Sequence, residues 1–141
     1  MSADNYIVKL LAVRDDSEWE LREKLRQKEY DTDAIDAAIN EAWDRKWLLP
    51  PEVLSQKVAR GLSQKHKSRR YIHAYLAKKR LPEVEIEEEE EFEKAKHLAE
   101  KKFHFEEAFT FEDKKKVLQY LRNRAFQDSV IRMVIDEFER N

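Results

Sequence analysis

The sequence predicts an all-α protein made of three tandem three-helix repeats that form an elongated, curved array. Two features of its composition support this class. The 141 residues include one Gly and three Pro, whereas β-rich folds and phosphate-binding loops use glycine freely. Charged residues make up 41% of the chain, against roughly 25% in an average globular protein. The abundant Glu, Lys, Leu, Ala and Arg are strong helix formers.

The third observation is a 23-residue template that recurs with offsets of 51 and 45 residues. Each copy places apolar residues four positions apart, then a basic residue, then an apolar residue at a corner. Its members, copy by copy, are Leu21, Leu25, Lys28 and Tyr30; Ile72, Leu76, Lys79 and Leu81; and Val117, Leu121, Arg124 and Phe126. Apolar residues at i and i+4 share one helix face, and a basic residue favours the helix C-terminus. The template therefore predicts a helix that ends at a corner.

Polar residues mark where the first helix of each copy should begin. Ser17, Ser68 and Asp113 stand four residues before the first apolar position, where their side chains can cap free amides. After the corner, a second helix is expected to begin near Thr32 or Asp128. It should present isoleucines to the core, and these are Ile35 and Ile39, Ile86, and Ile131 and Ile135, with Glu90 breaking the pattern in the second copy.

A further helical stretch precedes each copy, which gives three units of three helices. The expected units are residues 1–50, a basic unit at residues 51–90, and residues 91–141. Units this small bury little core alone, so we expect them to stack as solenoid repeats do. The single glycine, Gly61, is expected to mark close packing or a bend in the second unit.

The residue patterns favour neither an enzyme nor a metal protein. The chain has no Cys, which excludes disulfides and cysteine–zinc sites and fits a reducing compartment. The close histidine pairs, His66 with His73 and His97 with His104, are seven residues apart, about 10.5 Å along a helix, too far to share one zinc. No stretch approaches 18 apolar residues. We expect a cytoplasmic protein that is not an enzyme and has no cofactor or metal.

The charge distribution predicts a binding surface in the middle of the chain. No acidic residue occurs between Val53 and Pro82, while the run from Glu83 to Glu93 is strongly acidic. The candidate contact residues for an anionic partner are Lys57, Arg60, Lys65, Lys67, Arg69, Arg70, Tyr71, His73, Lys78 and Arg80. The alternative is a solvated face that the neighbouring glutamates neutralise. Tyr71 could stack on bases, whereas Tyr75 is assigned to the core.

Three segments of the chain resemble the RecX family of regulatory proteins. In "LAVRDDSEWELREKL" the family's pattern L..R..S..EL...L is matched by Leu11, Arg14, Ser17, Glu20, Leu21 and Leu25. The segments "HKSRRYIHAYLAKKRL" and "DKKKVLQYLRNRAFQDSVIRMVID" resemble its second and third units. The resemblance covers nearly the whole chain. The family usually has Gly at the helix corners, where this chain has Glu29, Arg80 and Ala125.

The resemblance implies a modulator of the RecA recombinase, with roles in recombination, DNA repair and the SOS response. Members of the family lie in the groove of the RecA filament on single-stranded DNA and damp its recombinase and co-protease activities. The implied partners are that filament and single- or double-stranded DNA, and the chain is expected to act as a monomer. The residues alone leave two alternatives open: a stand-alone nucleic-acid-binding helical module, or a scaffold for another acidic protein.

Overall fold

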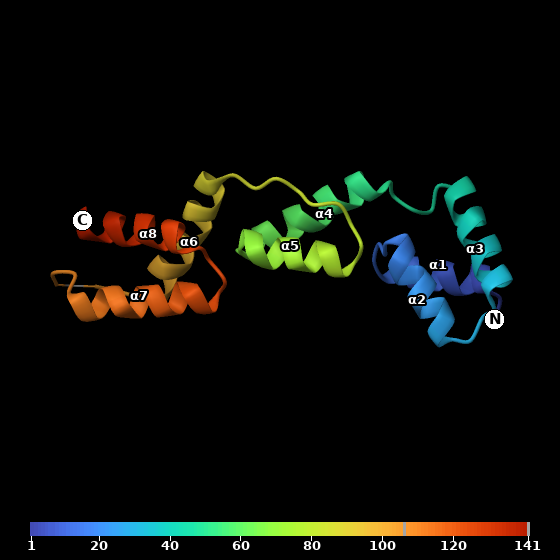
Figure 1. Cartoon of the computed structure of the whole chain (residues 1–141), viewed down its shortest axis with the longest axis horizontal. Coiled ribbons are helices and arrows are strands. Elements are labelled where there is room, and N and C mark those ends of the chain that lie inside the picture. The colour runs from blue at the N-terminus through green and yellow to red at the C-terminus, as the bar shows by residue number, and fades with distance from the viewer. Residues whose placement is uncertain (106, 141) are drawn as a thin grey trace. The chain divides into compact units, whose positions relative to one another are not determined.

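The computed structural model describes residues 1–105 and 107–140, and within these residues the chain is helical and has no strand. The described helices, shown in Figure 1, are α1 (Ala3–Val13), α2 (Glu18–Gln27), α3 (Thr32–Asp44), α4 (Pro51–Gln64), α5 (Arg69–Lys78), α6 (Glu88–Lys102), α7 (Phe111–Asn123) and α8 (Asp128–Arg140). The all-α prediction is confirmed. The predicted curvature of the array stays a prediction.

The chain divides into two compact units, each with its own core. The first unit comprises Met1–Val58 and Leu76–Glu83, and the second comprises Ala59–Tyr75 and Val84–Asn141. Helices α4 and α5 therefore contribute residues to both units. The predicted repeat boundaries at residues 50/51 and 90/91 stay a prediction.

Residues of the first and third template copies belong to the two cores, while Ile72, Leu76 and Leu81 of the second copy are buried outside them. In the first unit, α1, α2 and α3 pack around Leu21, Leu25, Ile35 and Ile39, all of which are buried. In the second unit, α7 and α8 pack against each other and α6 crosses them at a steep angle (Figure 1). The buried residues of this second core are Ala95, Ala99, Val117, Leu121, Phe126, Val130, Ile131 and Val134. The spacing of apolar residues therefore predicted the buried faces correctly.

The three template corners adopt one backbone geometry. Glu29, Arg80 and Ala125 have φ values of 67°, 57° and 67°. After each of them an apolar residue donates its backbone N–H to the carbonyl five residues earlier, as in Tyr30 to Leu25 at 3.2 Å. The equivalent bonds are Leu81 to Leu76 at 2.9 Å and Phe126 to Leu121 at 3.2 Å. This is the Schellman C-cap, in which glycine is the preferred residue because it adopts positive φ without strain.

The middle of the chain departs from the three-helix template. It contains α4 and α5, but residues 81–87 are not helical. In this segment Val84 and Ile86 are buried while Glu83, Glu85 and Glu87 are exposed. An alternation of period two is typical of extended chain, and Pro82 disfavours helix in the residue before it. The expectation of a third helix in this repeat was wrong for that reason.

The expected start of α7 was also wrong. Asp113 does not cap α7 as its N-cap, because the helix begins at Phe111 and its N-cap is Thr110. Asp113 instead completes a capping box, in which its carboxylate accepts from the Thr110 backbone N–H at 2.9 Å. Close packing does not explain Gly61, because a Cβ there would meet no atom within 4 Å apart from its chain neighbours and the backbone of its own helix, and the expected bend stays a prediction.

Candidate nucleic-acid interface

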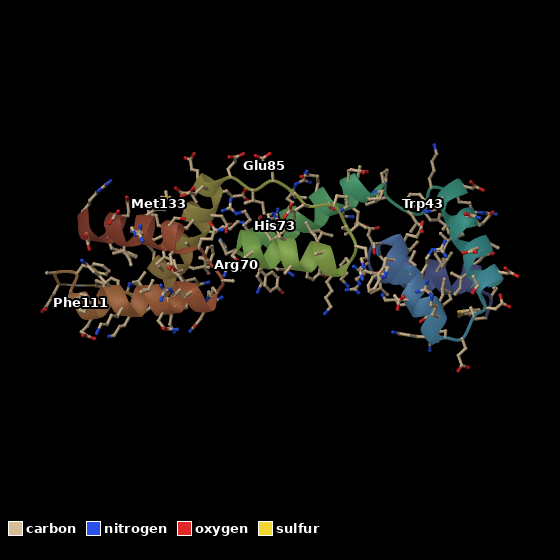
Figure 2. The ribbon with its side chains drawn as sticks, viewed as in Figure 1. Trp43, Arg70, His73, Glu85, Phe111 and Met133 are labelled. Carbon is tan, nitrogen blue, oxygen red and sulfur yellow. The ribbon has the colours of Figure 1, made fainter. Side chains whose placement is uncertain are left out.

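Two of the predicted contact residues, Arg69 and His73, hydrogen-bond to the segment that follows α5. The Arg69 guanidinium donates to the Ile86 carbonyl oxygen and to Gln127 Oε1, both at 2.9 Å. His73 Nε2 lies 2.8 Å from the Val84 carbonyl oxygen, and Figure 2 shows His73 beside the segment that carries Glu85. These contacts hold residues 84–86 against α5. Both side chains therefore stabilise the fold.

The remaining cations of the stretch are mostly exposed. Lys57 forms an ion pair with Asp15, and the Arg80 guanidinium lies 5.4 Å from the centre of a Trp19 ring. The other four exposed cations form no ion pair with any residue of the described ranges, and these are Arg60, Lys65, Arg70 and Lys78. The hydrogen bond from Arg122 lowers the pKa of Asp128, and the charge of Arg70 lowers it slightly further, so Arg70 has a weak attraction to that carboxylate. Exposed charges outside ion pairs remain available to an external anion. Figure 2 shows Arg70 near the start of α5.

The second unit also contains a surface pocket of about 440 Å³ between two helix corners. The corner between α4 and α5 and the first turn of α5 contribute one side, and the end of α7 and the corner after it contribute the other. The lining residues are His66, Lys67, Ser68, Tyr71, Tyr120, Asn123, Arg124 and Ala125. Among the described residues that line the pocket, none is acidic.

Local helix chemistry explains why these side chains converge. His66 has a φ of 61° and ends the corner after α4, where Lys67 donates its backbone N–H to the Leu62 carbonyl at 3.0 Å. Ser68 then caps α5, because its Oγ accepts the backbone N–H of Tyr71 at 3.1 Å. Ala125 holds the same positive-φ position after α7. Each side of the pocket is therefore a Schellman corner that presents the side chains before and after it.

The pocket contains two pairs of a cation with an aromatic ring. Lys67 Nζ lies 4.9 Å from the centre of the Tyr71 ring. The Arg124 guanidinium lies 4.9 Å from the centre of the Tyr120 ring. Tyr120 also meets Phe103 edge to face at 5.5 Å, which fixes its orientation. Positive charge beside exposed ring faces is the chemistry that binds a phosphate and a base together.

His66 contributes a neutral ring to the pocket wall. It stacks on His97 with ring centres 4.2 Å apart. Burial lowers the pKa of His66 below its usual value, and the nearby charges of His97, Lys101 and Lys94 lower it further. Near neutral pH the ring is therefore uncharged and offers one N–H donor and one nitrogen acceptor.

The residues predicted from the sequence lie on only one side of this pocket. They include Lys67 and Tyr71, whereas Arg124 was assigned to a helix cap and Tyr120 and Asn123 were not selected. A signal was present, because Tyr120 near the end of α7 and its C-cap Arg124 are four residues apart, the same spacing that joins Lys67 to Tyr71. Which corner would face which could not be read from one sequence.

A second basic region lies in the first unit, where Arg14, Lys24 and Lys79 are paired with buried carboxylates. Glu20 accepts a hydrogen bond from Lys79 Nζ at 2.6 Å and lies 3.5 Å from the Arg14 guanidinium. Asp16, whose side chain is fully buried, accepts from Arg14 at 3.1 Å and from Lys24 at 2.8 Å. Burial alone would raise the pKa of Glu20, but the hydrogen bonds from Lys79 and from the Ser17 backbone hold it below its usual value.

The described residues contain no group of three or more His, Cys, Asp or Glu side chains that could hold a metal ion. None of the helices they form is long and apolar enough to cross a membrane.

Known proteins and family models resemble the chain over most of its length. Residues 3–41 match the family model of the RecX first three-helix domain, and residues 88–135 match that of the RecX third three-helix domain. Regulatory protein RecX of Haemophilus influenzae (strain PittEE) is 30% identical over 135 residues, which cover 89% of this chain and 87% of that protein. Regulatory protein RecX of Haemophilus ducreyi is 52% identical over 46 residues, 33% of this chain and 30% of that protein.

A solved structure shows the same fold. The crystal structure of RecX from Lactobacillus salivarius matches with a TM-score of 0.79 at 19% identity, covering 99% of this chain and 96% of that one. The fold is therefore a RecX-like helical repeat array. Together with the full-length sequence relatives, these findings show that the chain belongs to the RecX family of regulatory proteins.

Proposed function

We propose that this protein binds the RecA recombinase filament on single-stranded DNA and inhibits its recombinase and co-protease activities. The name shared by its relatives supports a regulatory role. The observation that supports contact with the filament is the set of four exposed cations that form no ion pair with the described residues, namely Arg60, Lys65, Arg70 and Lys78. A filament that contains DNA phosphates offers a dense anionic surface to such cations.

The proposed contact residues are fewer than those selected from the sequence. In the second unit they are Arg60, Lys65, Lys67, Arg70 and Tyr71, and in the first unit they are Lys78 and Arg80. Lys57, Arg69 and His73 remain candidates only through their position, because their side chains already bond to Asp15 or to residues 84–86. Charge reversal at Arg60, Arg70 and Lys78 should therefore reduce binding without unfolding the chain.

The test is the effect of the protein on RecA in the presence of single-stranded DNA. ATP hydrolysis and strand exchange by RecA should fall when the protein is present well below the RecA concentration. The triple variant Arg60→Glu, Arg70→Glu, Lys78→Glu should inhibit at least tenfold less, since several phosphate or carboxylate contacts are lost. The matched control is Lys116→Glu, an exposed lysine on α7, which should inhibit normally.

Two results would contradict the proposal. If RecA activity is unchanged at every ratio of the two proteins, the regulatory role on RecA is wrong. If the folded triple variant inhibits as well as the natural chain, the contact surface is wrong.

The pocket in the second unit favours one other function, a nucleic-acid-binding module that acts without a recombinase. Its two tyrosines and two cations suit a single strand of DNA. A salt-dependent complex with single-stranded DNA, combined with no effect on RecA, would favour this alternative.

A further inference from the structure

We propose that the pocket between the α4–α5 corner and the end of α7 binds one unstacked nucleotide of a single DNA strand. In this proposal Tyr71 stacks on the base, and Lys67 and Arg124 bind the flanking phosphates. The inference rests on the proposed function only in that single-stranded DNA is the shared ligand. DNA binding is measured without RecA, so the two proposals can fail separately.

The charge of the pocket selects for an anion. Lys67 and Arg124 enter it from different helix corners, and none of its described lining residues is acidic. Beyond the lining, Lys102 Nζ lies 5.9 Å from the Tyr120 ring centre and adds a third cation near that side. A compact group of cations that lacks a neutralising carboxylate attracts phosphate, and its effect falls with added salt.

Tyr71 supplies the stacking surface. Its side chain is on an exposed part of α5, and the residue is 43% exposed although its ring is large and apolar. The cation–π contact with Lys67 is worth only about 0.5–1 kcal/mol at an exposed site. When a phosphate arrives, the Lys67 ammonium can leave the ring and pair with it. The face that Lys67 covered is then open to the base, while Tyr75 remains stacked with the Tyr71 ring at 6.5 Å between ring centres.

Tyr120 and the polar residues complete the walls. Phe103 meets Tyr120 edge to face, so the ring is held before any ligand binds. The Asn123 Oδ1 accepts a hydrogen bond from Gln119 at 2.9 Å, so the Asn123 amide presents its NH₂ group as a donor. A pocket of about 440 Å³ is within the range that holds a small ligand. Donors and ring faces without a fixed pattern of acceptors suit any base, so little sequence preference is expected.

The experiment compares a short fluorescent oligothymidylate with a strand of the same length and charge that lacks bases. Fluorescence anisotropy on the full chain should show about 5- to 150-fold tighter binding to the strand with bases, the range for stacking one base. Tyr71→Ala should lose this factor on the strand with bases and bind the two strands equally. Lys67→Ala and Arg124→Ala should weaken binding to both strands and each reduce the salt dependence by about 0.7 of a unit in log K against log salt.

Helix α7 offers a matched control. Phe111 is 68% exposed, and Lys115 Nζ lies 4.9 Å from its ring centre, which reproduces the Lys67–Tyr71 pair. Figure 2 shows Phe111 at the start of α7. The pocket residues Tyr120 and Asn123 lie at the other end of this helix. Phe111→Ala should leave both affinities unchanged. Circular dichroism of each variant establishes that it is folded.

The outcomes separate the possible ligands. Equal affinity of the natural chain for the two strands, or an unchanged affinity of folded Tyr71→Ala, overturns the inference. Loss of RecA inhibition in Tyr71→Ala with unchanged DNA affinity also overturns it, because the pocket would then bind a protein segment. Displacement of the strand by free ATP supports the nucleotide chemistry and shows that a soluble nucleotide can occupy the same pocket.

Discussion

The two segments that flank the middle of α5 are both basic, but they differ in what the lysines contact. In residues 76–83, Lys79 binds the carboxylate of Glu20, whose side chain is only 8% exposed. In residues 66–71, Lys67 lies over the exposed ring of Tyr71 and its pocket has no acidic lining residue among those described. The difference teaches that a run of basic residues is not one surface. The partner of each cation decides whether it stabilises the fold or remains available to a ligand.

In residues 76–83, the cation stabilises the fold because its partner carboxylate is buried. Glu20 accepts from Lys79 and from the Ser17 backbone, while Ser17 Oγ donates to the Lys79 carbonyl oxygen at 2.9 Å. These bonds join the start of α2 to the chain after α5 within the first unit. Removing one member leaves the others desolvated with fewer partners, which costs far more than losing an exposed contact.

The largest expected effect is therefore the loss of Glu20. Glu20→Ala should lower the free energy of unfolding by about 3 kcal/mol, since it leaves Lys79 without this carboxylate and removes half of the α2 capping box. Urea denaturation followed by circular dichroism measures the change. The control is Glu23→Ala on the same helix, whose ion pair with Arg26 is exposed and worth about 0.5 kcal/mol. Equal losses of unfolding free energy in the two variants would show that a buried ion pair contributes no more to stability than an exposed one.

The second expected effect is a pH dependence that comes from the same carboxylate. The pKa of Glu20 is lower in the folded chain than its usual value of 4.5. The unfolded chain therefore binds the proton more readily, so the stabilisation is present above pH 4.5 and is lost as pH falls through the folded value. The stability difference between the natural chain and Glu20→Gln should shrink as pH falls from about 7 to about 3. A constant difference across that range would show that charge at Glu20 contributes nothing.

Several features of the fold could be predicted because they depend on local pattern. Leu21, Ile72 and Val117 are all fully buried, as their spacing predicted. The same template located the three corners, since an apolar residue after a basic one marks a helix end. The segment 81–87 was misjudged because its template isoleucine, Ile86, is buried as expected but on extended chain. Its alternation with glutamates was the signal that was overlooked.

The site was predictable only in part because its halves are far apart in sequence. A charge count selected Lys67 and Arg69 alike, but only the structure shows that Arg69 bonds to Ile86 and Gln127. Tyr120 and Arg124 belong to a segment of mixed charge, so composition gave no reason to select them. Contacts between segments about 50 residues apart depend on how helices pack, and that information is not in the local pattern.

The third prediction concerns two helix corners, one in each unit. Glu29, after α2, and Ala125, beside the pocket, both hold positive φ without being glycine. The left-handed conformation costs about 1–2 kcal/mol in such residues, and part of the gain from glycine is offset by its greater freedom in the unfolded chain. Glu29→Gly and Ala125→Gly should therefore each raise the free energy of unfolding by about 0.5–1 kcal/mol. Thermal and urea denaturation of both variants measure this, and destabilisation by either would contradict the corner geometry.

The smallest expected effect on stability belongs to Lys67. Lys67→Ala removes only an exposed cation–π contact, so the free energy of unfolding should fall by about 0.5 kcal/mol or less. Lys79→Ala is the matched change at a cation with a buried partner, and it should cost several times more stability because Glu20 would be left buried without its main partner.

The order of the two effects should reverse for the affinity for single-stranded DNA. Lys67→Ala should weaken binding, whereas Lys79→Ala, if it is still folded, should not. Urea denaturation and anisotropy on the same two variants therefore test the comparison from both sides. If Lys79→Ala proves harmless to stability while Lys67→Ala unfolds the chain, burial of the partner carboxylate is not what divides these cations.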